Sequence, residues 1–288
     1  MRFFAFRSKH GTGLAVRAPD GRYRGLLAGA AGFPGDLRSI LRAGGNGLRV
    51  AAAALSNGAP VNPAEIEYLP PIMNPDKIIC VGLNYADHTA ESGFKAPTYP
   101  AIFTRYATTL VGHGAPIIRP RVSEQLDYEG ELAAVIGRHG RHIPVDAALD
   151  YVAGYSVFND GSVRDYQFKS PQWTVGKNFD GTGPFGPDFV TADELPPGAT
   201  GLRIQTRLNG MVVQSASTAD MVFNVATLVA VLSVAMTLAP GDVIVTGTPA
   251  GIGAARKPPL WMKTGDVCEV EIESIGVLRS PIADEPNG

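Results

Sequence analysis

Short apolar runs, each ended by glycine, proline or a polar pair, dominate this chain. Runs of this kind at 77–82, 128–137, 151–159 and 241–247 predict short buried strands. The 34 glycines and 23 prolines are spread along the whole length, which favours strands joined by turns over a helical bundle. We therefore expect a mostly β protein of the α+β class.

Turn pairs and one long apolar segment add detail. The Asp-Gly pair at 20–21 and the Asn-Gly pair at 209–210 are strong hairpin signals, so we expect a hairpin around each. Residues 224–238 predict the one long helix, which Asn224 would cap and Pro240 would end.

A stretch rich in proline and turn residues at 55–71 divides the chain. We place a domain boundary near residue 70, where such linkers commonly lie. The expected units are a small N-terminal domain at 1–70, with one or two short helices within 35–54, and a larger domain at 71–288.

Two acidic residues lie where the pattern predicts a strand that enters a core. Glu129 and Glu131 are two apart, so a strand points both carboxylates to one face, and the residues at 132–136 are all apolar. Like charges near a core are costly unless a cation neutralises them, and oxygen ligands suit Mg²⁺, Mn²⁺ or Ca²⁺. A strand with a solvated outer face explains the same pattern, so both interpretations stay open.

A third acid strengthens the metal hypothesis. Asp160 follows the apolar run at 151–159 and precedes Gly161. Three carboxylates, together with water and substrate oxygens, would complete an octahedral Mg²⁺ site. The alternative for Asp160 is a cap on the helical turn expected at 162–168.

Several further motifs accompany these acids. In chain order they are Tyr128-Glu129-Gly130-Glu131-Leu132, Gly154-Tyr155 with Asn159-Asp160, Arg164-Asp165, Gly176-Lys177-Asn178-Phe179-Asp180, Gly183-Pro184-Phe185-Gly186-Pro187 and Thr246-Gly247-Thr248-Pro249-Ala250-Gly251-Ile252-Gly253. In this order and spacing they resemble the fumarylacetoacetate hydrolase family, over roughly residues 71–281. The first seventy residues look like the variable N-terminal domain of many members.

The resemblance has consequences for fold, cofactor and assembly. It implies a mixed β-roll with a small N-terminal domain, and usually a homodimer. It also implies a Mg²⁺ or Mn²⁺ ion held by Glu129, Glu131 and Asp160, which agrees with the strand argument.

The segment at 82–91 resembles the lid of the acylpyruvate hydrolase and oxaloacetate decarboxylase branch of that family. There a histidine and a glutamate three residues later act as a dyad, which here would be His88 and Glu91. Positions three apart share a helix face, so Glu91 can orient the imidazole. An exposed surface pair on a helix that begins at Asn84 is the alternative.

Further residues around these motifs suggest roles next to a bound 2-oxo acid. For Lys177 the alternatives are an electrostatic clamp and a surface lysine whose stem is buried, and the resemblance favours the clamp. Lys177 would stabilise the charge that develops on a metal-bound 2-oxo acid. Arg164 and Gln167 would clamp the substrate, Thr248 would donate to its carboxylate, and Trp173 would form a wall of the pocket. Ordinary salt bridges or loop contacts are the alternative for Arg164, Gln167 and Thr248.

The leading functional hypothesis is a metal-dependent hydrolase that cleaves a C–C bond of an acylpyruvate-like or β-diketo acid, in the breakdown of aromatic compounds or sugars. The same site would suit an oxaloacetate-type decarboxylase, a 2-hydroxymuconate-type isomerase or a dehydratase of 2-oxo-3-deoxy sugar acids. A non-catalytic protein that binds a 2-oxo acid is a rival of a different class.

Composition excludes other partners. The net charge is −2 with no basic stripe, which argues against nucleic acid. The longest apolar stretch, at 225–239, is shorter than the roughly 20 residues of a membrane span, and the first ten residues lack a signal-peptide core. The two cysteines show no disulfide or metal spacing, so we expect a cytoplasmic protein.

Overall fold

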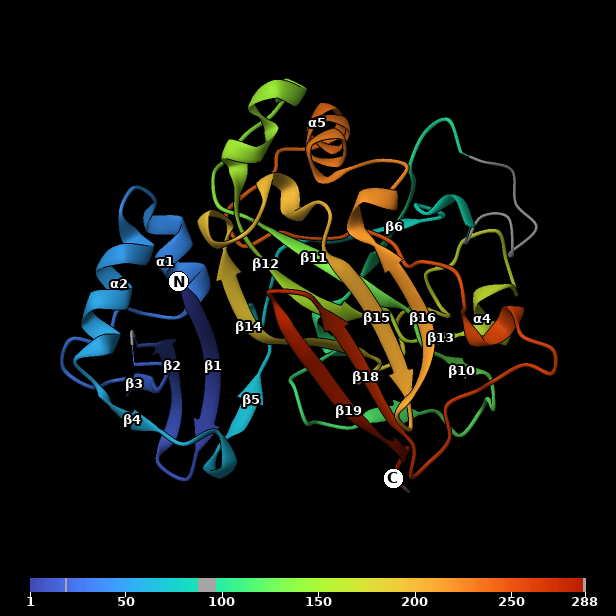
Figure 1. Ribbon diagram of the computed structural model, residues 1–288, viewed down its shortest axis with the longest axis horizontal. Helices are drawn as coiled ribbons and strands as arrows, with labels where there is room; N and C mark the ends of the chain where they lie inside the picture. The colour runs from blue at the N-terminus through green and yellow to red at the C-terminus, as the bar shows by residue number, and fades with distance from the viewer. Residues whose placement is uncertain (19, 88–96, 287–288) are drawn as a thin grey trace.

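The computed structural model describes residues 1–18, 20–87 and 97–286, and two large β-sheets form its framework (Figure 1). Within these residues, twelve strands form the larger sheet and five the smaller, which confirms the predicted α+β, mostly β class. In order across the larger sheet, the main strands are β4 (Ala59–Val61), β3 (Tyr23–Leu27), β2 (Gly11–Arg17), β1 (Arg2–Ser8), β14 (Gly183–Thr191), β12 (Val152–Asn159), β11 (Gly130–Ile136), β17 (Val243–Val245), β6 (Ile78–Gly82) and β7 (Ala101–Arg105). Two further strands, β5 (Glu67–Leu69) and β8 (Leu110–Val111), pair with β1 and β14.

The smaller sheet packs against one face of the larger one. In order, its strands are β16 (Met211–Ser217), β15 (Arg203–Leu208), β18 (Val267–Ile272), β19 (Gly276–Asp284) and β9 (Ile117–Arg119). A separate pair consists of β10 (Leu126–Asp127) and β13 (Ser162–Val163). Both expected hairpins are confirmed, since β2 pairs with β3 and β15 pairs with β16.

Strand β11 shows why the central strands read as unbroken apolar runs. Its residues Leu132, Ala134 and Ile136 belong to the core cluster that also contains the small sheet. Ala133 and Val135 belong to the cluster on the opposite face. Because both faces are covered, every position of β11 is buried, and the strand is apolar without alternation from Leu132 to Ile136.

Helices cover the two faces of the larger sheet differently. On one face lie α1 (Leu37–Ala43) and α2 (Gly47–Ser56), which confirm the short helices expected in this region. On the other face lies α5 (Val225–Ala235), beside the 3₁₀ helix at Val145–Tyr151. In the part of the chain that the structure describes, the other short helices are α4 (Arg164–Gln167) and 3₁₀ turns at Pro63–Glu65, Ala107–Thr109, Ala192–Glu194, Pro197–Ala199, Thr218–Asp220 and Gly253–Ala255.

Helix α5 begins as predicted and ends earlier than predicted. The Asn224 side chain accepts a hydrogen bond from the Thr227 N–H at 3.0 Å, as an N-cap does. The helix ends at Ala235, before Pro240, so the proline does not terminate it. Leu238 exchanges two backbone hydrogen bonds with Gly140, which draws the chain into extended backbone.

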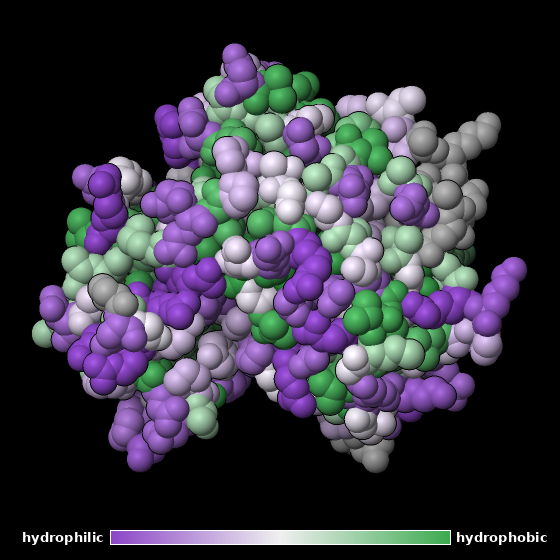
Figure 2. Space-filling model, viewed as in Figure 1, coloured by the Kyte–Doolittle hydropathy of each residue, from purple (hydrophilic) through white to green (hydrophobic). Residues whose placement is uncertain are grey.

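The N-terminal strands continue the larger sheet, because β1 pairs with β14. A notch between these strands and the small sheet is visible at the lower edge of the face shown in Figure 2.

The division at residue 70 remains a prediction. Within the described residues, no helix is long and apolar enough to cross a bilayer.

Candidate active site

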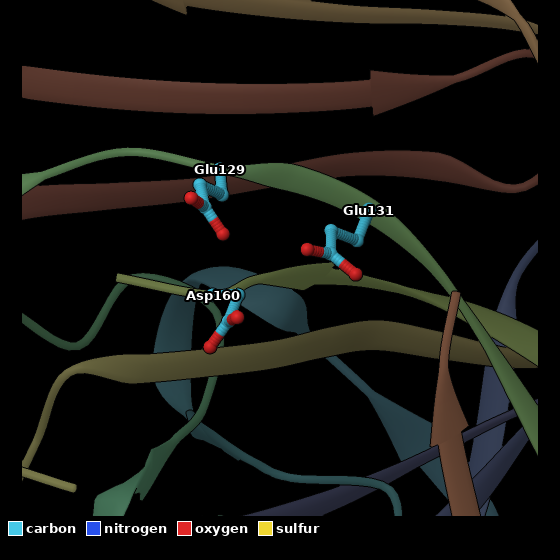
Figure 3. A group of neighbouring side chains, drawn as sticks. All are labelled: Glu129, Glu131 and Asp160. Atoms are coloured by element: carbon cyan, nitrogen blue, oxygen red, sulfur yellow. The ribbon is translucent and has the colours of Figure 1, made fainter. Parts of the chain in front are cut away.

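The three predicted acids converge in the structure. Strands β11 and β12 are antiparallel with Glu131 opposite Phe158, so the start of β11 lies beside the end of β12. The Asp160 N–H donates to the Glu129 carbonyl at 2.9 Å, so a backbone hydrogen bond joins the residue before β11 to the residue after β12. Oxygen atoms of Glu129, Glu131 and Asp160 lie within 4.8 Å of one another, and all three residues are buried (Figure 3).

Lys177 lies among these acids. Its Nζ donates to Glu129 Oε2 and to Asp160 Oδ2, both at 2.6 Å. Burial would lower the lysine's pKa, but Asp160 and Glu129 raise it above the ordinary value. Lys177 therefore stays an ammonium and acts as a positive charge and hydrogen-bond donor.

Arg164 is likewise an internal cation. Its Nη2 lies 2.6 Å from Glu129 Oε1, and its Nε donates to Asp127 Oδ2 at 2.8 Å. Its Nη1 donates to Gln167 Oε1 at 2.8 Å, because the two residues are three apart on α4. Arg164 and Gln167 both line the pocket, next to each other as expected. Their role in binding substrate remains a prediction.

Thr248 lies in the pocket wall, and its role in binding substrate remains a prediction. It lines the pocket, but its hydroxyl donates to the Gly130 carbonyl at 3.0 Å and accepts from Gln214 Nε2 at 2.8 Å. A hydrogen bond from this hydroxyl to a substrate carboxylate would require the bond to Gly130 to break. The Gly130 carbonyl therefore competes with a substrate carboxylate for the hydrogen bond from Thr248.

Sequence reasoning missed Arg105, which ends β7. Its Nη1 lies 2.5 Å from Asp160 Oδ1 and donates to the Gly161 carbonyl at 3.0 Å. Its Nη2 donates to Thr182 Oγ1 at 2.7 Å. The signal available in the sequence was a basic residue at the end of a strand, but its partner Asp160 is distant along the chain.

Asp127 was missed as well. Its Oδ1 accepts from the Gly253 N–H at 2.7 Å and its Oδ2 from the Ala254 N–H at 2.9 Å. This fully buried carboxylate thus ties the glycine-rich loop to Arg164 and to the acidic corner. The loop is a structural wall of the pocket, in agreement with Ile252, Ala254 and Ala255 among its lining residues.

The donor set suits a divalent cation. Burial, followed by the charges of Asp160 and Glu129, raises the pKa of Glu131 well above its usual range. Its Oε2 accepts the Gly247 N–H at 2.5 Å, and Gly247 has a positive φ of 101° that favours glycine. Around the pocket, the described residues include four buried acids and three buried bases: Asp127, Glu129, Glu131 and Asp160, with Arg105, Arg164 and Lys177. A hard cation bound by oxygens would offset the excess negative charge.

A cavity of about 240 Å³ opens over this cluster. Glu129, Glu131 and Lys177 form its polar floor, and Phe103, Phe168 and Trp173 form an aromatic side. Trp173 therefore lines the pocket, as predicted. His88 and Glu91 lie outside the described residues, so their dyad remains a prediction.

Fold and site together define an enzyme scaffold with an acidic pocket that can hold a metal ion. The model of the family described as "Fumarylacetoacetate (FAA) hydrolase C-terminal" matches residues 77–283. The chain belongs to the fumarylacetoacetate hydrolase family, which confirms the resemblance found in the sequence.

Curated relatives carry tautomerase names. The chain is 41% identical over 288 residues to human "Oxaloacetate tautomerase FAHD2A, mitochondrial", covering 98% of this chain and 91% of that protein. It is 43% identical over 253 residues to the Xenopus laevis "Oxaloacetate tautomerase fahd2, mitochondrial", covering 87% and 79%. Because these names say mitochondrial, they lend no support to the expected cytoplasmic location, which remains a prediction.

Solved structures agree on the fold. A fumarylacetoacetate hydrolase from Exiguobacterium antarcticum superposes with a TM-score of 0.86 at 36% identity, covering 99% of this chain and all (100%) of that one. A 5-carboxymethyl-2-hydroxymuconate delta-isomerase from Mycobacterium smegmatis gives 0.79 at 32% identity, with coverage of 99% and 100%. The expected family fold is confirmed. The Exiguobacterium antarcticum protein is named a hydrolase, but none of these names is that of an acylpyruvate hydrolase, and the curated relatives are named tautomerases. The comparisons therefore favour proton-transfer chemistry over the leading hydrolase hypothesis.

Proposed function

We propose that this protein is a metal-dependent tautomerase that interconverts the keto and enol forms of oxaloacetate. The observation that carries the proposal is the near full-length similarity to proteins named oxaloacetate tautomerase, combined with the buried acidic cluster. The reaction moves one proton between carbon 3 and the oxygen on carbon 2, and it needs no attacking water. Proton transfer thus replaces hydrolysis, the leading hypothesis from sequence.

Glu129, Glu131 and Asp160 would hold Mg²⁺ or Mn²⁺. When bound, such an ion supplies Lewis acidity to a 2-oxo acid and stabilises its enolate. Lys177 would place its ammonium beside the oxygen that gains negative charge, because its raised pKa keeps the proton on Nζ. With Lys177 in this electrostatic role, the carbon-bound proton needs another acceptor.

A separate base must therefore accept the proton from carbon 3 as the C–H bond breaks, and a proton must reach the oxygen on carbon 2. We assign the base to His88, oriented by Glu91, which keeps the predicted dyad with a new task. The His88→Ala variant would then lose tautomerisation while its Mn²⁺ affinity stays unchanged. Full activity of that variant would remove His88 from the mechanism.

A substrate panel tests the proposal against its rivals. Purified protein with Mg²⁺ or Mn²⁺ would be given oxaloacetate, acetylpyruvate, fumarylpyruvate and a 2-hydroxymuconate-type diacid, with EDTA controls. The proposal expects loss of the enol absorbance of oxaloacetate without release of carbon dioxide. Carboxylic acid and pyruvate formed from an acylpyruvate would restore the hydrolase hypothesis, and carbon dioxide release would favour a decarboxylase.

An isomerase is the second candidate. The structural similarity to the Mycobacterium smegmatis isomerase supports it. Isomerisation of a hydroxymuconate is also a proton transfer next to a 2-oxo carbon, so the same residues would serve. Preference for the longer diacid over oxaloacetate in the panel would favour this candidate. Whether the protein is a homodimer remains a prediction.

A further inference from the structure

Trp173 lines both an inner cavity and an outer groove of the protein. The inner one is the cavity of about 240 Å³ above the acidic cluster. The outer one is a more open groove of about 690 Å³, lined by Ile102, Gln172 and the residues around them. Both are lined by Phe103, Phe168 and Trp173, so these three aromatic side chains form the partition between them.

The partition is held close to the reacting end of the pocket. The Trp173 ring meets the Phe103 ring edge-on, with centroids 5.6 Å apart. Phe103 in turn lies under the Lys177 ammonium, with Nζ 4.9 Å from the ring centroid. Any enlargement at Trp173 therefore opens the cavity directly beside the polar floor.

Gly82 explains how the indole fits so tightly. A Cβ at position 82 would lie 2.4 Å from the Trp173 Cζ3 atom, far inside contact distance. Gly82 ends β6, and both residues line the inner pocket. The absence of a side chain at Gly82 thus makes room for the indole in the partition.

We propose that Trp173, seated against Gly82, limits the length of the 2-oxo acids that this site accepts. The partition separates the acidic cluster from the outer groove, so it excludes 2-oxo diacids whose chains would extend into that groove. This inference rests on the proposed function, because it assumes that the 2-oxo acid head binds at the acidic cluster. It assigns Trp173 a role in specificity and leaves the proton transfer to other residues.

Binding of two ligands of different length tests the partition. Dissociation constants for oxalate, which carries only the head group, and for six-carbon 2-oxoadipate would be measured by calorimetry with Mn²⁺. The wild-type protein should bind oxalate and bind 2-oxoadipate poorly. In Trp173→Ala the oxalate constant should change little, while 2-oxoadipate should bind about tenfold or more tightly, since even one methylene in a pocket is worth about 10–200-fold.

Matched variants separate a partition from a general disturbance. Gln172→Ala alters an exposed neighbour that lines only the outer groove, and it should leave the ratio of the two constants unchanged. Gly82→Ala should displace the indole and alter the ratio, but it should have no such effect when Trp173 is already alanine. Trp173→Leu serves the same comparison if the alanine variant does not fold.

The outcomes distinguish this inference from the proposed function. Equal ratios in the wild type and in Trp173→Ala would overturn the partition, as would tight binding of 2-oxoadipate to the wild type. Oxalate binding and the expected change in ratio, without any tautomerisation of oxaloacetate, would support the partition and reject the tautomerase. No Mn²⁺-dependent oxalate binding would overturn both.

Discussion

Arg105 and Asp160 form an ion pair that is entirely buried, with Nη1 and Oδ1 2.5 Å apart. The other oxygen of Asp160 accepts from Lys177, so this carboxylate is contacted by two cations. Desolvated charges of this kind depend on their partners, because removing one leaves the other uncompensated. The pair therefore links the stability of the fold to the acidic site.

Replacing Arg105 should be costly. We expect Arg105→Met to lower the free energy of unfolding by about 3–5 kcal/mol, because Asp160 would lose a buried partner. Urea unfolding measures the change. The exposed pair of Arg119 and Asp284 offers the control, since Arg119→Met removes an ion pair that water already screens. Similar losses in the two variants would contradict the importance of the buried pair.

The metal assignment predicts a sharp loss of affinity on single substitutions. Glu129→Gln and Asp160→Asn should each weaken Mn²⁺ binding by more than the roughly 10–100-fold typical of an outer-shell change. Titration followed by electron paramagnetic resonance would give the affinities. Glu124→Gln removes an exposed charge and should have little effect. Unchanged Mn²⁺ binding in either ligand variant would refute the assignment.

Lys177 should be needed for turnover and dispensable for metal binding. Its ammonium occupies oxygen atoms of Glu129 and Asp160, so Lys177→Met should retain or tighten Mn²⁺ binding. The same variant should lose about 10²–10³-fold in kcat, the scale seen when an oxyanion donor is removed. Paired measurements of Mn²⁺ affinity and steady-state rates test this, with exposed Lys263→Met as the control. Near wild-type kcat would exclude an electrostatic role.

Asp188 predicts a pH-dependent stability that has no connection with catalysis. Burial, only partly opposed by the hydrogen bond from the Tyr23 hydroxyl at 3.1 Å, raises the pKa of Asp188 from 3.8 to about 6. The folded state then binds this proton more tightly than the unfolded state does. The contribution of Asp188 to the free energy of unfolding is therefore present below pH 4. It is lost as the pH rises towards 6, by up to about 3 kcal/mol.

Unfolding free energies between pH 4 and 8, measured in EDTA to exclude metal effects, would reveal this loss. Asp188→Asn should flatten the profile in that interval. Tyr23→Phe should move the loss to higher pH, because the tyrosine hydroxyl lowers the pKa of Asp188. A wild-type profile with the same slope as that of Asp188→Asn would contradict the raised pKa.

Local patterns explain which features could be predicted from the sequence. The two-residue period of a strand placed Glu129 and Glu131 on one side, and the end of an apolar run marked Asp160. The turn pairs likewise marked both hairpins. These features depend on neighbours in the chain, so a single sequence contains them.

The missed features depend on pairing between distant segments. Arg105 meets Asp160 across 55 positions, and Asp127 meets the Gly253 N–H across 126. The Thr248 hydroxyl donates to the Gly130 carbonyl, 118 positions away, and would have to give up this bond to contact a substrate. Such partners are fixed only once the strand order is known, which local patterns do not provide.

Tautomerase activity is measured best as the rate at which enol-oxaloacetate becomes the keto form, followed by ultraviolet absorbance or by coupling to a keto-specific dehydrogenase. We expect a rate well above the spontaneous one with Mg²⁺ or Mn²⁺, its loss in EDTA, and its absence in Glu131→Gln. A rate equal to the spontaneous one in metal-loaded protein, or one unaffected by EDTA, would contradict the proposed function.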